Sequence, residues 1–116
     1  QDTNNEKVMP FVKEFNHYLD ILKKFSEWTI KRTETNKDDV SAAANDYLKT
    51  LGYISLAFSW IKVLNVSFND YEENKRFYDD KINTAKFYFD KVLPRAEQHY
   101  KSAITGSSNI MNFKFN

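Results

Sequence analysis

The residues that could do chemistry in this sequence are few, and their spacing favours structural roles. The two histidines, His17 and His99, stand outside any Glu-x-x-His pattern, the spacing that brings a carboxylate and an imidazole to a metal in a helical bundle. In "EQH" the carboxylate lies two residues before His99, which is the wrong spacing for one helix face. We therefore expect both histidines to be partly exposed polar or capping residues, and we expect no metal site.

Neighbouring carboxylates occur as "DD" at 38–39 and 79–80 and as "EE" at 72–73. Such pairs could do acid–base work, but these lie near expected helix starts, where the helix dipole favours negative charge. The sequence has no G-x-G-x-x-G, phosphate-loop or G-x-S-x-G motif, and no base is visible to activate Ser107 or Ser108. The residues alone therefore indicate no catalytic and no cofactor-binding position.

The composition is that of one helical domain. A chain of 116 residues with 41% hydrophobic and 28% charged residues can form a single core. Only two glycines and two prolines punctuate it, which favours a few long helices over many short strands. The net charge is +1 with interspersed signs, so we expect no nucleic-acid partner. The absence of cysteine excludes disulfides and is compatible with the cytoplasmic location that we expect.

The N-terminal segment "QDTNNEKVMP" lacks the basic start and apolar run of a signal peptide. The chain also begins with Gln, so we expect residues 1–116 to be a single domain cut from a longer protein.

Apolar residues that recur at spacings of three and four predict the first two helices. The first runs from about residue 6 to residue 33, with Pro10 in its first turn, where a missing N–H is harmless. Its seam is Val8, Phe11, Phe15, Tyr18, Leu22, Phe25 and Thr29. Asn36 is predicted to cap the second helix. The seam of the second helix is Val40, Ala44, Tyr47, Leu51, Ile54, Phe58 and Ile61.

The third helix is predicted to begin at "NDYE", where Asn69 and Glu72 form a variant of the capping box. Its apolar stripe keeps helical phase across Pro94, so we expect the helix to kink there or to stop and restart in register. Gly106 is predicted to be a left-handed C-cap before a short tail. The stripe is Phe77, Ile82, Ala85, Tyr88, Phe89, Val92, Leu93, Ala96, Ala103 and Ile104. The predicted fold is all-α, an up-down bundle of three long helices with a short C-terminal tail.

Beyond Thr50 the second helix is apolar nearly all round, which predicts that it is sandwiched between neighbours. Serines and Lys62 interrupt the apolar run, so we expect no membrane span. Two docking surfaces are predicted because exposed apolar patches usually mark interaction sites. They are the row Tyr53, Leu56, Trp60 and Val63 opposite the seam, and the line from Phe87 to Pro94 on the third helix. The alternative is that the first helix covers the Trp60 face.

Two blocks, "DYLKTLGYISLAFSWIKV" (46–63) and "DDKINTAKFYFDKVLPRAEQHYKSAITGSSNIM" (79–111), resemble a known family. They are similar to the C-terminal helical domain of the larger bacterial acyl-CoA dehydrogenases, the subgroup that includes methylmercaptopropionyl-CoA dehydrogenase. The resemblance covers residues 40–115 and departs from the family pattern at Lys49 and Thr50. The matching positions are Asp46, Tyr47, Leu48, Gly52, Trp60, Lys81, Thr84, Ala85, Phe87, Tyr88, Leu93, Pro94, Ile104, Gly106 and Met111.

The resemblance implies a parent flavoprotein, an oxidoreductase of fatty acid metabolism that uses FAD to take a hydride from an acyl-CoA thioester. In that family the glutamate base and the flavin site belong to the preceding dehydrogenase body. It follows that this chain carries no catalytic or cofactor-binding residue and is inactive alone. Its expected partners are the dehydrogenase body of the same chain and further copies of the parent in a homo-oligomer. The alternative is a free-standing helical protein-interaction module.

Overall fold

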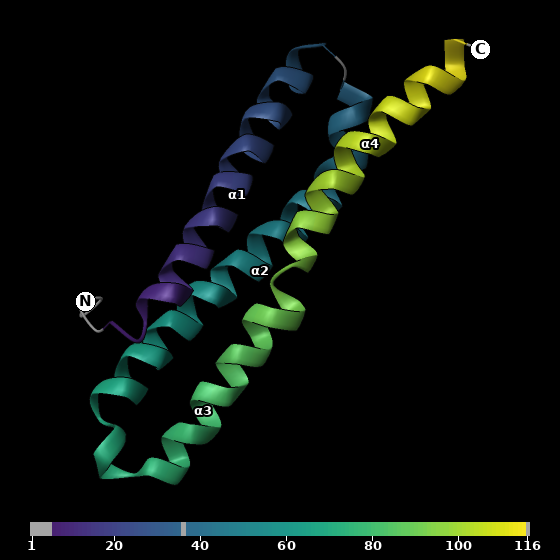
Figure 1. Cartoon of the computed structure of the whole chain (residues 1–116). Coiled ribbons are helices and arrows are strands. Elements are labelled where there is room, and N and C mark those ends of the chain that lie inside the picture. The colour runs from purple at the N-terminus through teal and green to yellow at the C-terminus, as the bar shows by residue number, and fades with distance from the viewer. Residues whose placement is uncertain (1–5, 36, 116) are drawn as a thin grey trace.

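The computed structural model describes residues 6–35 and 37–115, and within them the side chains of residues 6–34, 41 and 43–105. All elements in these ranges are helical, so the all-α prediction is confirmed. The order is α1 (Met9–Thr35), α2 (Lys37–Asn69), the 3₁₀ turn η1 (Tyr71–Glu73), α3 (Lys75–Phe87), the π-helical segment η2 (Tyr88–Val92) and α4 (Arg95–Phe115). Figure 1 shows α1 and α2 running in opposite directions, with α3 and α4 together forming a third leg that returns along α2. The molecule measures 63 × 22 × 18 Å.

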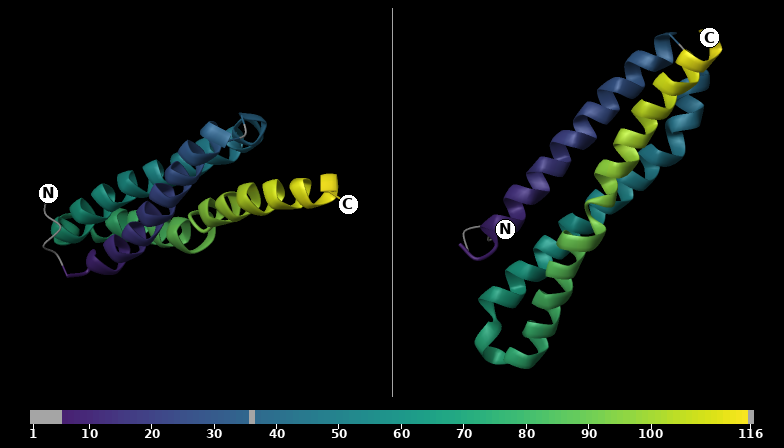
Figure 2. Two further views of the ribbon diagram at one scale, coloured as in Figure 1. Left: turned by 90° about the horizontal axis from the view of Figure 1, so that it is seen from above. Right: turned by 45° about the vertical axis from the view of Figure 1, so that its right-hand side comes forward.

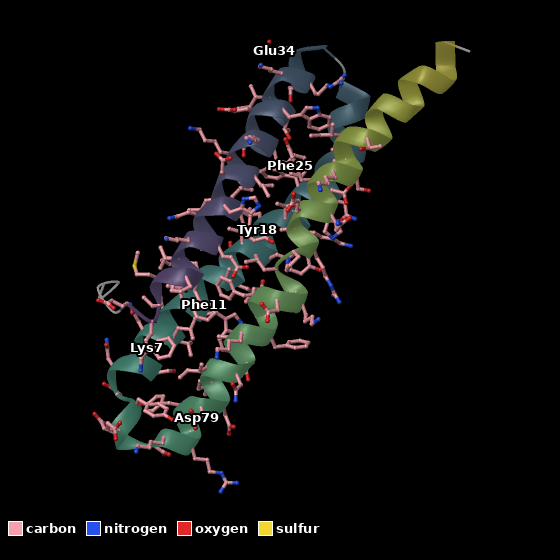
Figure 3. The ribbon with its side chains drawn as sticks, in the orientation of Figure 1. Lys7, Phe11, Tyr18, Phe25, Glu34 and Asp79 are labelled. Atoms are coloured by element: carbon pink, nitrogen blue, oxygen red, sulfur yellow. The ribbon has the colours of Figure 1, made fainter. Side chains whose placement is uncertain are left out.

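Helix α1 presents the predicted seam to the interior. All seven predicted positions are buried or half-buried, and Pro10 is the second residue of the helix, as expected. Sequence reasoning left out Ile21, which is also buried. Figure 3 shows Phe11, Tyr18 and Phe25 along the side of α1 that faces the other helices. This stripe supplies one wall of the core.

Helix α2 is the central element and packs against α1, α3 and α4. The prediction that this helix is sandwiched between neighbours is confirmed. Its buried stripe differs from the predicted seam, however. Tyr47, Ile54 and Ile61 belong to both. The predicted seam residues Ala44, Leu51 and Phe58 are exposed instead, the last two at 39% and 47%. The positions that fill the core instead are Ala43, Thr50, Ala57 and Leu64. Three of these are small, which lets neighbouring helices approach closely. The predicted cap Asn36 and the side chain of Val40 lie outside the described residues.

By length and composition alone, α2 from Ala43 to Asn69 could cross a membrane, with 33% of its apolar window buried inside the fold. A core helix of a soluble protein meets the same criterion. The position of α2 between the other legs accounts for the apolar residues of its inner side.

The third leg does not begin where the sequence predicted. Asn69 is the last residue of α2, and the N-cap of α3 is Asn74, whose side-chain oxygen accepts a hydrogen bond from the Phe77 N–H at 3.2 Å. The predicted cap at Asn69 is therefore wrong. The chain needs the residues of η1 to reverse direction, so the helix starts five residues later, at the next asparagine.

The prediction for Pro94 is confirmed in its second form, because the helix stops and restarts in register. The Leu93 N–H bonds to the Tyr88 carbonyl, five residues back, at 2.8 Å, and α4 begins at Arg95. Proline has no N–H to continue the ladder, and the wider π turn accommodates it. Leu93 and Ala96 are both fully buried, so the apolar stripe passes through the break. Figure 2 shows α3 and α4 as consecutive parts of one leg.

The predicted end of the third leg is wrong. Helix α4 continues through Gly106 to Phe115, and no glycine in the described ranges has a positive φ. A glycine inside a helix costs about 1 kcal/mol relative to alanine but does not by itself end the helix. The segment predicted as a short tail is therefore helical as far as Phe115.

The described side chains form two apolar core clusters along the long axis. The larger one joins α1, α2 and the third leg, and includes the edge-to-face contact of Phe11 with Phe89 at a centroid distance of 5.2 Å. The smaller cluster surrounds the fully buried Phe25. Together they hold the three legs at fixed orientations, which decides which faces of α2 and α3 stay exposed.

Candidate docking surfaces

The predicted row on α2 has mixed exposure. Leu56 is 53% exposed, whereas Tyr53, Trp60 and Val63 are half-buried. The element that partly covers the row is the third leg: the Tyr88 hydroxyl donates a hydrogen bond to the Tyr53 carbonyl, and the Tyr88 ring lies 6.5 Å from the Trp60 ring. The alternative prediction was that the first helix covers the Trp60 face, whereas these contacts come from the third leg. The role of the row in docking stays a prediction.

The second predicted surface lies on the third leg. Phe87 is 61% exposed at the end of α3, and Pro94 is half-buried after η2. An exposed ring of this size can bury 150–250 Å² against a partner. Phe87 is therefore available for contact, and its docking role also stays a prediction.

The predicted row includes only Leu56 of a more continuous exposed surface on the same helix. We call this surface the outer face of α2. It carries Leu48, Leu51, Leu56 and Val66, which are 39–64% exposed. It also carries the exposed residues Gly52, Ser55, Ser59 and Lys62. These positions recur at spacings of three and four on the side opposite the buried stripe. That second repeat was readable in the sequence, but nothing local marked it as the exposed one.

The outer face of α2 has an unusual charge pattern. Lys49 and Lys62 are the only charged residues between Tyr47 and Asn69. The Lys62 ammonium lies 4.6 Å from the centre of the Phe58 ring, and no ion pair joins either lysine to a residue of the described ranges. The face is therefore apolar with Lys62 on it and no acid, and the exposed Lys49 lies at its edge, about a quarter of a turn around the helix.

An apolar groove adjoins this face between α2 and α3. Its volume is about 330 Å³. The groove is lined by Val63, Val66, Ser67, Phe77 and Tyr78 and by two lysines, Lys62 and Lys81. The Lys81 ammonium lies 5.2 Å from the centre of the half-exposed Phe77 ring. Phe77 belongs to the predicted core stripe, but it lines the groove instead. The groove extends the apolar surface from α2 onto α3.

The fold also brings together polar side chains that are distant in the sequence. His99 Nδ1 on α4 lies 2.8 Å from Asp46 Oδ1 on α2, and the His99 ring stacks on the Tyr53 ring at 5.9 Å. Close to this pair, the buried Thr50 hydroxyl donates to the Asp46 carbonyl at 2.8 Å and lies 3.4 Å from the Ala96 carbonyl. His17 lies 3.6 Å from Glu97. Both histidines thus join helices, and 53 residues separate His99 from its partner, so spacing could not reveal the pair.

Burial raises the pKa of several ionisable side chains, the core residue Tyr18 among them. It raises the pKa of the Tyr88 phenol to about 12, with a smaller contribution from the Tyr53 phenol. Burial also raises the pKa of Glu14, helped by the nearby Asp90 carboxylate. Among the described residues, no group of three or more His, Cys, Asp or Glu side chains could hold a metal ion. The raised pKa values of Tyr88 and Glu14 make the stability of the fold depend on pH.

Comparison with protein families identifies a match to nearly the whole chain. Residues 1–114 match the family described as acetyl-CoA dehydrogenase C-terminal like, which extends over the N-terminal part where the sequence carries no distinctive motif. Comparisons with curated proteins and with solved structures give no significant match. Because the family covers nearly all of the 116 residues, this chain belongs to the C-terminal domain family of acyl-CoA dehydrogenase-like proteins.

Proposed function

We propose that the chain is an accessory domain of an FAD-dependent acyl-CoA dehydrogenase and that it acts in packing and assembly. The outer face of α2 carries this proposal, because four apolar side chains that are 39–64% exposed lie along one helix. Contiguous exposed apolar residues are typical of interaction surfaces. Family membership supplies the partner that such a surface fits, namely the dehydrogenase body of the same chain.

FAD would be held by that body. A dinucleotide pyrophosphate is commonly bound by backbone N–H groups of a glycine-rich turn at a helix start. In this chain Gly52 lies inside α2 and Gly106 inside α4. At the start of α3, the Asn74 side chain already accepts from the Phe77 N–H. The described residues therefore do not fit FAD, and no step of the dehydrogenation is assigned to them.

Finer parts of the proposal are supported by the motifs of the two resembling blocks. They favour the methylmercaptopropionyl-CoA dehydrogenase subgroup, and with it a cytoplasmic, homo-oligomeric enzyme of acyl-CoA or fatty acid metabolism. Phe87, together with Leu56 and Trp60, is proposed to contact the body or a second subunit. Pro94 sets the direction of the third leg beside them.

The test uses the longer parent chain, purified with and without the segment that corresponds to residues 1–116. The intact parent should retain stoichiometric flavin after dialysis and reduce a dye with an acyl-CoA, and removal of the domain should change its assembly in sedimentation. The 116-residue chain alone should hold no flavin. A parent without flavin and without dye reduction would refute the proposed function and leave the free-standing interaction module.

Within an active parent, Trp60→Ala and Phe87→Ala should weaken domain or subunit association by more than about 1 kcal/mol, as loss of aromatic anchors does. Asn83→Ala, at an exposed polar position on α3, is the matched control. Unchanged association in both aromatic variants would remove these two residues from the docking surface.

A further inference from the structure

We propose that the outer face of α2 receives one helix of the dehydrogenase body of the same chain, and that this helix carries carboxylates opposite Lys49 and Lys62. The inference rests on the proposed function and names the contact that it requires. The outer face is exposed along its whole length, from Leu48 at 64% to Val66 at 50%. Figure 1 shows this central helix with α1 and the third leg beside it.

The centre of the outer face favours a helix as occupant. Gly52, Ser55 and Ser59 are exposed there, and apart from the chain neighbours and the backbone of its own helix no described atom lies within 4 Å of the position that a Cβ would take on Gly52. Small residues let two helix backbones approach closely, with bulky side chains above and below the contact. A lipid surface would gain little from this centre, because membrane binding grows with the apolar area inserted.

The size of the face argues for a tethered partner. From residue 48 to residue 66 a helix is about 27 Å long and about 10 Å wide, which gives about 270 Å². A stable complex of separate proteins buries about 800 Å² on each partner. A second copy held by this face alone would therefore bind weakly. A body in the same chain needs less area, because a short linker supplies an effective concentration in the millimolar range.

The charges of the face also disfavour a second copy. Lys49 and Lys62 are 13 residues apart, which is about 20 Å along a helix. A pair of α2 helices joined through their outer faces would bring four lysines and no carboxylate to one contact. Such a pair gains no opposite charge, whereas carboxylates about 20 Å apart along a partner would match the two lysines.

The absence of cysteine makes this contact directly measurable. Ser55→Cys places one thiol at the centre of the outer face, and its rate of reaction with a maleimide dye reports accessibility. We expect fast labelling in the 116-residue chain and labelling at least 10-fold slower in the flavin-containing parent, after subtraction of the rate of the parent without this substitution. Asn16→Cys, at an exposed position on the far side of α1 from its seam, should label at rates within threefold of each other in the two proteins.

Equal labelling of Ser55→Cys in the 116-residue chain and in an active, flavin-containing parent would overturn the inference while the proposed function stands. Protection already present in the 116-residue chain and lost on dilution would assign the face to a second copy. Protection that appears only with vesicles of anionic phospholipid would assign it to a membrane surface. Either result overturns the inference.

Two further variants of the parent test the chemistry of the contact. Lys49→Glu with Lys62→Glu should speed labelling of Ser55→Cys at least fivefold, whereas Lys23→Glu with Lys86→Glu, at exposed positions on α1 and α3, should not. Gly52→Leu should also speed labelling, because a large side chain prevents close approach of the partner helix. Slow labelling that persists in both outer-face variants would refute the proposed occupant.

Discussion

Replacement of Tyr88 by phenylalanine should lower the stability of the protein at neutral pH but not at alkaline pH. The Tyr88 side chain is only 7% exposed, and its hydroxyl donates to the Tyr53 carbonyl. Near pH 8 the variant loses this hydrogen bond and should be less stable by about 1 kcal/mol. The loss is modest because the Tyr53 carbonyl lies within α2 and still accepts a backbone hydrogen bond of that helix.

At alkaline pH the Tyr88 hydroxyl stabilises the folded protein less, because the buried phenol begins to ionise. Burial raises the pKa of Tyr88 to about 12, against about 10 in an unfolded chain. The folded state therefore holds this proton more tightly, so its contribution is complete below pH 10 and is lost as the pH rises through 12. At pH 11 the wild type should have lost about 1.4 kcal/mol through this group. The phenylalanine variant loses nothing at this position, so its deficit of about 1 kcal/mol at pH 8 should disappear by pH 11.

The assay is urea unfolding of both proteins at pH 8 and pH 11, followed by circular dichroism at 222 nm. Ionisation of the other tyrosines and of the lysines occurs in both proteins and cancels in the difference. Thr50→Val is the matched control, because it also removes a buried hydroxyl that donates a hydrogen bond, but one that does not titrate. Its stability relative to wild type should be the same at both pH values.

A stability difference between wild type and Tyr88→Phe that stays constant from pH 8 to pH 11 would refute this reasoning. It would mean that the phenol is not buried in solution, or that the third leg has already separated from α2 below pH 11.

Three further substitutions test the fold, each by urea unfolding. Phe25→Ala should cost about 3–5 kcal/mol, because this fully buried ring contacts three others at centroid distances of 5.1–6.0 Å; a loss below 1 kcal/mol would place the ring outside the core. Gly52→Ala should stabilise the 116-residue chain by about 0.5–1 kcal/mol, since the new methyl group meets no atom within 4 Å, and a destabilised variant would show a contact at this position. Asn74→Ala should cost about 1 kcal/mol through loss of the helix cap, whereas Asn69→Ala at the predicted cap should not lower the stability through α3. If Asn69→Ala lowered the stability more than Asn74→Ala, the third leg would begin where the sequence predicted.

The features that the sequence predicted correctly depend on local rules. Pro10 at the start of α1 and the break at Pro94 follow from the missing N–H of proline, whatever surrounds it. The seam of α1 was readable because only one side of that helix is strongly apolar. The all-helical class followed from long periodic segments with almost no glycine or proline. The family resemblance depended on motifs in two such segments and is confirmed at the level of the family.

The features that needed the tertiary structure depend on contacts between distant segments. Residues apolar on all sides of α2 fit more than one buried stripe, and both candidate stripes share Tyr47, Ile54 and Ile61. Only the approach of the neighbouring legs decides that the small side chains of Thr50 and Ala57 are buried while Leu51 and Phe58 stay exposed. The exposed outer face of α2, with its two lysines, is the consequence of that choice. Local sequence could not decide it, because the free energy of burying a side chain depends on the surface that covers it, and the covering helices are supplied by other parts of the chain.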